Sequence, residues 1–103
     1  MLPKFTSYRL SRRAEHDLEG IYTYTVKHWS VDQANRYIAD IRAAILGLVD
    51  GGKVGRQRPD VIAGVLSYPV GSHLIFYRET EHIMVVRILH GMMDHSQHLG
   101  ESE

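Results

Sequence analysis

Apolar residues recur at helical spacing in two consecutive segments of the first half of the chain. The first segment follows Ser11, a suitable N-cap, and carries the stripe Leu18, Ile21, Tyr22, Thr25 and Trp29. The second follows the capping box Ser30-Val31-Asp32-Gln33, ends at Gly51-Gly52 and carries the stripe Ala34, Tyr37, Ile38, Ile41, Ile45 and Leu48. We therefore predict two helices that form an antiparallel hairpin, and we expect Trp29, Leu46 and Val49 in the core.

Runs of β-prone residues precede and follow this hairpin. A short run covers 5–10, and three longer runs cover 65–70, 73–78 and 83–89. The expected fold class is therefore α+β, with an N-terminal strand, an antiparallel helical hairpin and a three-stranded antiparallel meander. The helices are expected on one face of the sheet.

Two short connections set the register of the meander. Gly71-Ser72 suits a two-residue type II′ turn between the first two strands, which would pair Val70 with His73. Thr80-Glu81 suits another, which would pair Glu79 with His82. Pro69 cannot donate a hydrogen bond within a sheet, so the first strand of the meander is expected at an edge.

These registers divide the meander into two faces. The face expected beneath the helices consists of Leu66, Tyr68, Ile75, Tyr77, Met84, Val86 and Ile88. The opposite face is also largely apolar and consists of Val65, Ser67, Pro69, Leu74, Phe76, Arg78, Ile83, Val85, Arg87 and Leu89. Such a face is expected to be covered, either by the chain's own tail with Met92 and Met93 or by a second protein.

Length and composition favour a single domain over residues 1–103, with a C-terminal tail from about residue 91. Apolar residues make up 44% of the chain and charged residues 23%, which is typical of a globular protein. The absence of cysteine excludes disulfides and thiolate metal sites and favours a cytoplasmic location. Twelve basic and twelve acidic residues balance, so no direct sequence-specific nucleic acid binding is expected. No apolar run is long enough for a membrane span, so no membrane partner is expected.

Candidate chemistry is sparse. His90, His95 and His98 are the one histidine cluster near the C-terminus, but their spacing matches no familiar zinc pattern, so no metal and no cofactor are expected. The basic residues that could grip a phosphate backbone are Lys53, Arg56, Arg58, Arg78 and Arg87. RNA cleavage would also need a general acid and a general base, for which the candidates are His90, His95 and Tyr77, and Tyr77 is better placed in the core.

Four stretches in this order carry a resemblance to a known family. They are Tyr8-Arg9-Leu10-Ser11, Trp29-Ser30-Val31-Asp32-Gln33-Ala34, Gly71-Ser72-His73-Leu74-Ile75-Phe76-Tyr77-Arg78 and Val86-Arg87-Ile88-Leu89-His90-Gly91. The chain resembles ParE toxins of the RelE/ParE superfamily from about Tyr8 to Leu99. The resemblance implies the toxin of a bacterial type II toxin–antitoxin pair, which stabilises a plasmid or chromosome. It further implies inhibition of DNA gyrase without catalytic residues, and neutralisation by a ParD-type antitoxin.

The resemblance also assigns candidate sites. An antitoxin whose C-terminal segment wraps the toxin would cover the open sheet face, with contacts expected at Phe76, Arg78, Val85 and Arg87. The family's C-terminal segment is associated with toxicity, and it corresponds here to His90, Gly91, Met92, Met93 and Asp94. Many members carry basic residues between the glycine and the aspartate, where this chain has two methionines.

Two alternatives remain open within this interpretation. A RelE-type toxin is a ribosome-dependent mRNA endonuclease that uses clustered Lys and Arg with a C-terminal Tyr or another acid–base residue. This chain has Lys53, Arg56 and Arg58 but no Tyr after Tyr77. A remnant that binds antitoxin without toxicity is the third possibility.

Overall fold

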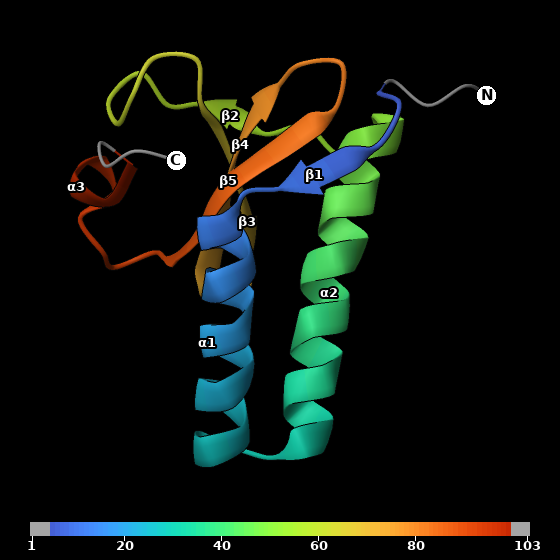
Figure 1. Ribbon diagram of the computed structural model, residues 1–103, viewed down its shortest axis with the longest axis vertical. Helices are drawn as coiled ribbons and strands as arrows, with labels where there is room; N and C mark the ends of the chain where they lie inside the picture. The colour runs from blue at the N-terminus through green and yellow to red at the C-terminus, as the bar shows by residue number, and fades with distance from the viewer. Residues whose placement is uncertain (1–4, 100–103) are drawn as a thin grey trace.

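Both long helices begin and end where the sequence places their caps. In the computed structural model, which describes residues 5–99, α1 spans Arg12–His28 and α2 spans Val31–Asp50. The Ser11 hydroxyl accepts a hydrogen bond from Ala14 N, and the Ser30 hydroxyl accepts one from Gln33 N, each at 3.0 Å. Gly51 ends α2 in the left-handed conformation, with φ of 85°. The predicted helical hairpin is confirmed (Figure 1).

A mixed sheet of five strands lies against this hairpin in the order β1-β5-β4-β3-β2. Its strands are β1 (Tyr8–Leu10), β2 (Arg56–Gln57), β3 (Leu66–Val70), β4 (His73–Glu79) and β5 (Ile83–His90). β1 runs parallel to β5, and the remaining pairs are antiparallel. The predicted α+β class and the three-stranded meander are confirmed, whereas β2 was not predicted.

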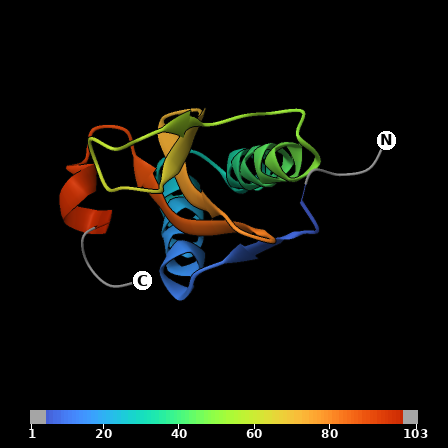
Figure 2. The same cartoon turned by 90° about the horizontal axis from the view of Figure 1, so that it is seen from above.

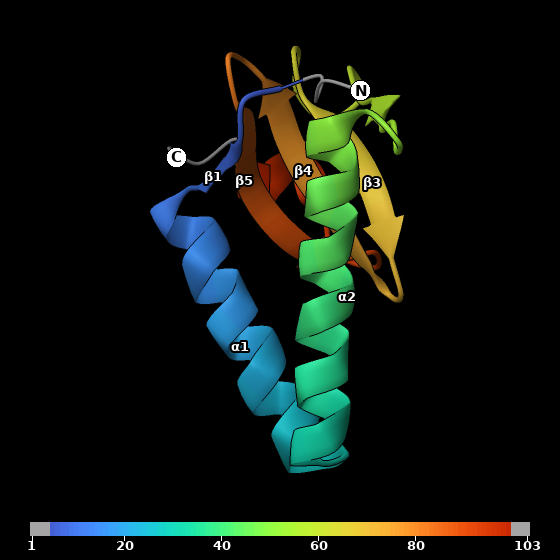
Figure 3. The same cartoon turned by 90° about the vertical axis from the view of Figure 1, so that its right-hand side faces the viewer.

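The sheet separates the hairpin from a short C-terminal helix. In Figure 2 the strands lie between α2 and α3 (His95–Leu99), which the sequence did not predict. Figure 3 shows that α1 and α2 run past the end of the sheet, towards the connection between them. The last turns of α1 and the first turns of α2 therefore lie beyond the strands.

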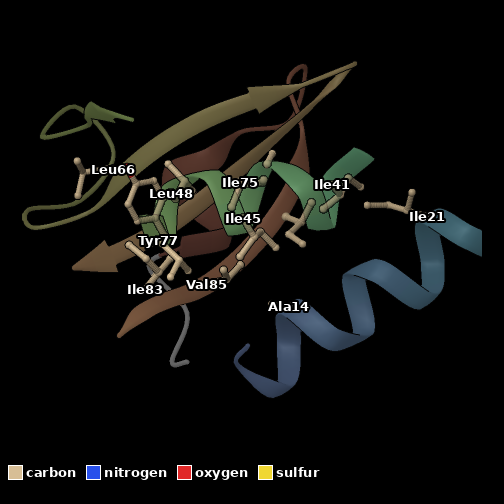
Figure 4. Close-up of a cluster of buried hydrophobic side chains, with 13 residues drawn as sticks. Ala14, Ile21, Ile41, Ile45, Leu48, Leu66, Ile75, Tyr77, Ile83 and Val85 are labelled. Carbon is tan, nitrogen blue, oxygen red and sulfur yellow. The ribbon is translucent and has the colours of Figure 1, made fainter. Parts of the chain in front are cut away.

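The main core lies between the hairpin and the sheet. Ile41, Ile45 and Leu48 of α2 pack with Ile75 and Tyr77 of β4, and all are buried (Figure 4). Removing the side chain of one such isoleucine beyond Cβ costs about 2–5 kcal/mol. Tyr77 is in the core as predicted.

The predicted register between β4 and β5 is wrong. Glu79 pairs with Ile83, not with His82, because Thr80, Glu81 and His82 form a three-residue connection. The hydroxyl of Thr80 donates to His82 O at 2.9 Å and accepts from His82 N at 3.1 Å, which stabilises the longer connection. This shift of one residue exchanges the two faces at the start of β5.

A bulge then brings the second half of β5 back to the predicted facing. Phe76 pairs with Arg87 and Tyr77 with Val85, which leaves Val86 as the extra residue. Ile83 and Val85 therefore join the core beneath the helices, whereas Met84 and Val86 pack on the opposite face. Figure 4 shows Ile83 and Val85 in the same cluster as Ile45.

The opposite face is covered by the chain itself, though not by the residues expected. Leu99 of α3 packs with Val65, Phe76, Val86 and Leu89, and Val61 and Ile62 border this cluster. Met92 is 88% exposed and lies away from this cover. Folding back of the tail is confirmed, but Leu99 takes the place assigned to the two methionines.

Four smaller expectations concern the burial of three residues and the sheet edge. Val49 is buried as expected, but Trp29 is 75% and Leu46 54% exposed, so placing these two in the core was wrong. Trp29 is the residue that follows α1, in the connection between the two helices, which lies beyond the end of the sheet (Figure 3). β3 is bordered by β2 only at Leu66 and Ser67, so its remaining part, with Pro69, forms a local edge.

Candidate partner-binding cleft

A cleft of about 750 Å³ lies where the hairpin extends past the ends of β4 and β5. Its walls come from α1, the helix connection, α2, the β3–β4 turn and the end of β5. We call it the hairpin cleft; it is lined by His16, Asp17, Gly20, Ile21, Tyr24, Thr25, Trp29, Gln33, Tyr37, Ser72, His73, Arg87, Ile88, Leu89, His90 and Met93. The sequence did not predict it, because Ile21 and Thr25 were counted only as core residues.

An ion pair between Arg87 and Asp17 forms one wall of the hairpin cleft. Arg87 Nε donates to Asp17 Oδ2 at 2.8 Å, and Arg87 Nη2 donates to Asp17 Oδ1 at 3.0 Å. Both side chains are largely buried. Asp17 Oδ2 also accepts from Ile88 N at 2.9 Å, because β1 ends at Leu10 and leaves this part of β5 without a neighbouring strand on the side away from β4. Removing one partner of such a buried pair costs about 3–5 kcal/mol.

Tyr37 joins α2 to the β3–β4 turn at another wall. Its hydroxyl donates to Val70 O at 3.0 Å, accepts from Ser72 N at 3.2 Å and lies 2.7 Å from His73 Nδ1. Gly71 has a φ of +56°, and a Cβ there would lie 2.6 Å from Cε1 of Tyr37. The expected pairing of Val70 with His73 is confirmed, and the close contact requires glycine at the turn.

His73 is a titratable residue of the cleft lining with a shifted pKa. Burial lowers this pKa below its ordinary value, and the adjacent His90 acts in the same direction. The two imidazole rings meet edge to face, with centroids 5.4 Å apart. Asp17 opposes this shift through its negative charge. The neutral form of His73 is therefore favoured in the folded protein.

The five residues expected to carry toxicity form one continuous segment beside the hairpin cleft. We call His90, Gly91, Met92, Met93 and Asp94 the C-terminal segment. His90 fixes its start: His90 O accepts from Met93 N at 3.1 Å, and His90 Nδ1 accepts from Met92 N at 3.1 Å. Met92 projects outwards, whereas Met93 and His90 line the cleft.

Asp94 closes the C-terminal segment and begins the turn into α3. Its carboxylate accepts from the Ser96 hydroxyl at 2.9 Å and from Gln97 N at 3.4 Å. These hydrogen bonds lower the pKa of Asp94 below its ordinary value. The segment is thus anchored at both ends, with the two methionines between the anchors.

The four residues expected to border an antitoxin groove do not share one open face. Val85 is fully buried beneath the helices, which contradicts its expected position, because the longer β4–β5 connection turns it round. Phe76 is on the expected face but is fully buried by the chain itself, with the ring of His95 4.9 Å away. Arg78 donates to Ala63 O at 3.2 Å, and Arg87 binds Asp17.

Arg58 of the basic loop and the acid–base candidates Tyr77 and His95 are engaged in structural contacts, whereas Lys53 and Arg56 are exposed. Arg58 binds Asp60 and donates to the Ser67 hydroxyl at 3.1 Å. The Tyr77 hydroxyl accepts from Gly55 N at 2.8 Å, and burial raises the pKa of Tyr77. A Cβ at Gly55 would collide with that hydroxyl, so the glycine permits the contact. His95 Nε2 lies 3.0 Å from His90 O.

Within residues 5–99, no three or more His, Asp or Glu side chains converge as possible metal ligands. None of the helices in this part of the chain is long and apolar enough to cross a membrane.

Comparisons with known proteins agree on one family. A family model described as "ParE toxin of type II toxin-antitoxin system, parDE" matches residues 8–95. Toxin ParE1 of Caulobacter vibrioides is 38% identical over 93 residues, which cover 90% of this chain and 97% of the relative. Toxin ParE of Escherichia coli is 34% identical over 91 residues, which cover 86% of this chain and 88% of the relative.

Solved structures support the same fold. A chain from the structure titled "Chromosomal ParDE TA system from P. aeruginosa" matches with a TM-score of 0.71 at 22% identity, over 84% of this chain and 95% of that one. A chain from the toxin–antitoxin complex RelBE2 of Mycobacterium tuberculosis matches with a TM-score of 0.59 at 23% identity, over 86% and 99% of the two chains.

Proposed function

Because the chain belongs to the ParE family of toxins from type II toxin–antitoxin systems, we propose that it inhibits DNA gyrase and is neutralised by a ParD-type antitoxin. Inhibition would come from binding, without a catalytic step of its own. The toxin function follows from the family, and the target and the antitoxin type are the proposed parts.

The C-terminal segment supports this proposal most directly. Met92 is 88% and Met93 44% exposed, although both are apolar. His90 and Asp94 hold the ends of the segment, so the methionines are presented in a fixed position. Exposed apolar side chains on an anchored turn favour contact with another protein. We assign the contact with gyrase to this segment.

The nuclease alternative is less well supported because two of its candidate groups, Tyr77 and Arg58, are engaged in contacts within the chain. A general acid or base must reach the substrate, but the Tyr77 side chain is buried and its hydroxyl binds Gly55 N. Arg58, in the basic loop, binds Asp60 and Ser67 instead of facing an open site. These contacts favour the binding mechanism over cleavage of mRNA.

A supercoiling assay with purified gyrase tests this proposal. We expect the wild-type chain to inhibit supercoiling and the double variant Met92→Ala/Met93→Ala to lose at least about tenfold in potency, since truncating interface anchors often costs 2 kcal/mol or more. Leu46→Ala is the matched control, because Leu46 is an exposed apolar residue on α2 outside the C-terminal segment.

The nuclease alternative predicts a different result. In that case the wild-type chain would leave supercoiling intact and would cleave mRNA in a translation reaction. That combination would reject gyrase as the target.

A further inference from the structure

We propose that the hairpin cleft is where the antitoxin neutralises this toxin, by inserting one apolar side chain with a carboxylate beside it. This inference rests on the proposed function, because it takes the antitoxin as the occupant. It differs from the sheet-face groove expected from sequence, which the chain itself covers.

The apolar part of the hairpin cleft provides a seat for the inserted side chain. Ile21, Thr25 and Leu89 are buried residues of its lining, whereas Tyr24 and Trp29 are 60% and 75% exposed. Aromatic residues around a concave apolar surface are typical of interface hot spots, since they bury large areas at low entropic cost. The cleft is therefore better suited to hold an apolar side chain of another chain than to remain in contact with water.

The polar part of the cleft favours a negatively charged neighbour for that anchor. His16 of α1 and His90 of β5 contribute imidazole N–H donors. The N–H groups of Arg87 already donate to Asp17 and to His98 O, and His73 Nδ1 lies against the Tyr37 hydroxyl. Asp17 is the one carboxylate of the lining, and its oxygens already bind Arg87 and Ile88 N. A carboxylate of the partner would meet donors here rather than like charge.

The position of the cleft explains how an occupant would neutralise the toxin. Met93 and His90 line the cleft and also belong to the C-terminal segment that we assign to gyrase contact. An anchor seated against Met93 would cover part of that segment. Antitoxin and gyrase would then compete for the same residues.

Trp29 provides a direct reporter of cleft occupancy, because it is the one tryptophan of the chain and lies in the cleft lining. The experiment titrates the full-length chain with the protein encoded directly upstream, with any tryptophan of that protein replaced by phenylalanine. We expect the Trp29 emission to move to shorter wavelength as the ring leaves water. Calorimetry on the same samples measures binding independently of Trp29.

Two tyrosines of α1 form a matched pair of variants. Tyr24 lines the hairpin cleft, whereas Tyr22 lines a shallow hollow on the other side of the hairpin, between α1 and α2. Tyr24→Ala is expected to weaken antitoxin binding at least about tenfold, and Tyr22→Ala less than about threefold. His16→Gln is expected to weaken binding at least about threefold, because it removes an imidazole N–H donor to the carboxylate of the partner.

Three results would overturn the proposal. Calorimetric binding with unchanged Trp29 emission and equal effects of the two tyrosine variants would place the antitoxin elsewhere, while leaving the proposed function intact. If the upstream protein does not bind at all, both the cleft proposal and the proposed function are contradicted. An emission shift that follows the concentration of the toxin alone would assign the cleft to a second copy of this chain.

Discussion

Single residues fix the geometry around the hairpin cleft through close backbone contacts. Gly71 allows the β3–β4 turn to lie against the ring of Tyr37, whose hydroxyl binds Val70 and Ser72. The sequence predicted a glycine turn at this position from local preferences alone. It did not predict Tyr37 as the partner of the turn, because the two are more than thirty residues apart.

Gly71→Ala is expected to destabilise the protein by at least about 1 kcal/mol, since it adds a Cβ at positive φ and against the Tyr37 ring. Gly20→Ala is the matched control, because Gly20 lies within α1 and a Cβ there meets nothing within 4 Å. The control is expected to stabilise the helix by about 0.5–1 kcal/mol. Urea unfolding measures the free energy of unfolding of both variants. Equal changes in the two variants would show that the turn does not need glycine.

The stability of the protein is expected to depend on the protonation of His73. Its pKa is lowered in the folded state from the ordinary 6.5, so the unfolded chain takes up the proton first as the pH falls. The free energy of unfolding should therefore be unaffected by His73 above pH 6.5 and should fall below it. The other charged and titratable groups around His73 are Tyr37, Asp17, Arg87, His16 and His90.

Urea unfolding at pH 7.5 and at pH 5.5 measures this contribution. The loss of stability between the two pH values should be larger in the wild type than in His73→Gln, which keeps a polar side chain but does not titrate. The same loss in both proteins would assign the pH dependence to other groups.

At the scale of elements, hydrophobic periodicity predicted the two helices and the meander but not the facing of β5. The helices carry polar residues between their apolar stripes, so only one orientation buries the stripe. From Ile83 to Leu89 every residue except Arg87 is apolar, so the pattern permits either facing. Contacts with distant residues decide the register: Ser7 accepts from Ile83 N, and Ser11 donates to Val85 O and to Val86 O.

Two lysine substitutions test the register of β5. Val85→Lys is expected to unfold the protein or to destabilise it by several kcal/mol, because it buries a charge beneath the helices. Met84→Lys is expected to cost much less, since Met84 is partly exposed and a lysine there can extend into water. Thermal unfolding followed by circular dichroism ranks the two variants by stability. The reverse order would restore the register that the sequence suggested.

At the scale of the whole molecule, the sheet has a different cover on each face, and the candidate site lies at one end. The hairpin covers one face, and α3 with the loop before β3 covers the other. The C-terminal segment could be identified from its resemblance to the family, because its residues are adjacent in sequence. The hairpin cleft could not, since its lining comes from four separate parts of the chain that only the fold brings together.

The central claim is that the hairpin cleft and the C-terminal segment form one surface, which either gyrase or the antitoxin occupies. Capture on immobilised gyrase tests this claim most directly, with toxin alone and with toxin saturated by its antitoxin. We predict that gyrase retains the free toxin and that the antitoxin releases it in proportion to its occupancy of the toxin. A stable ternary complex of gyrase, toxin and antitoxin would contradict the claim.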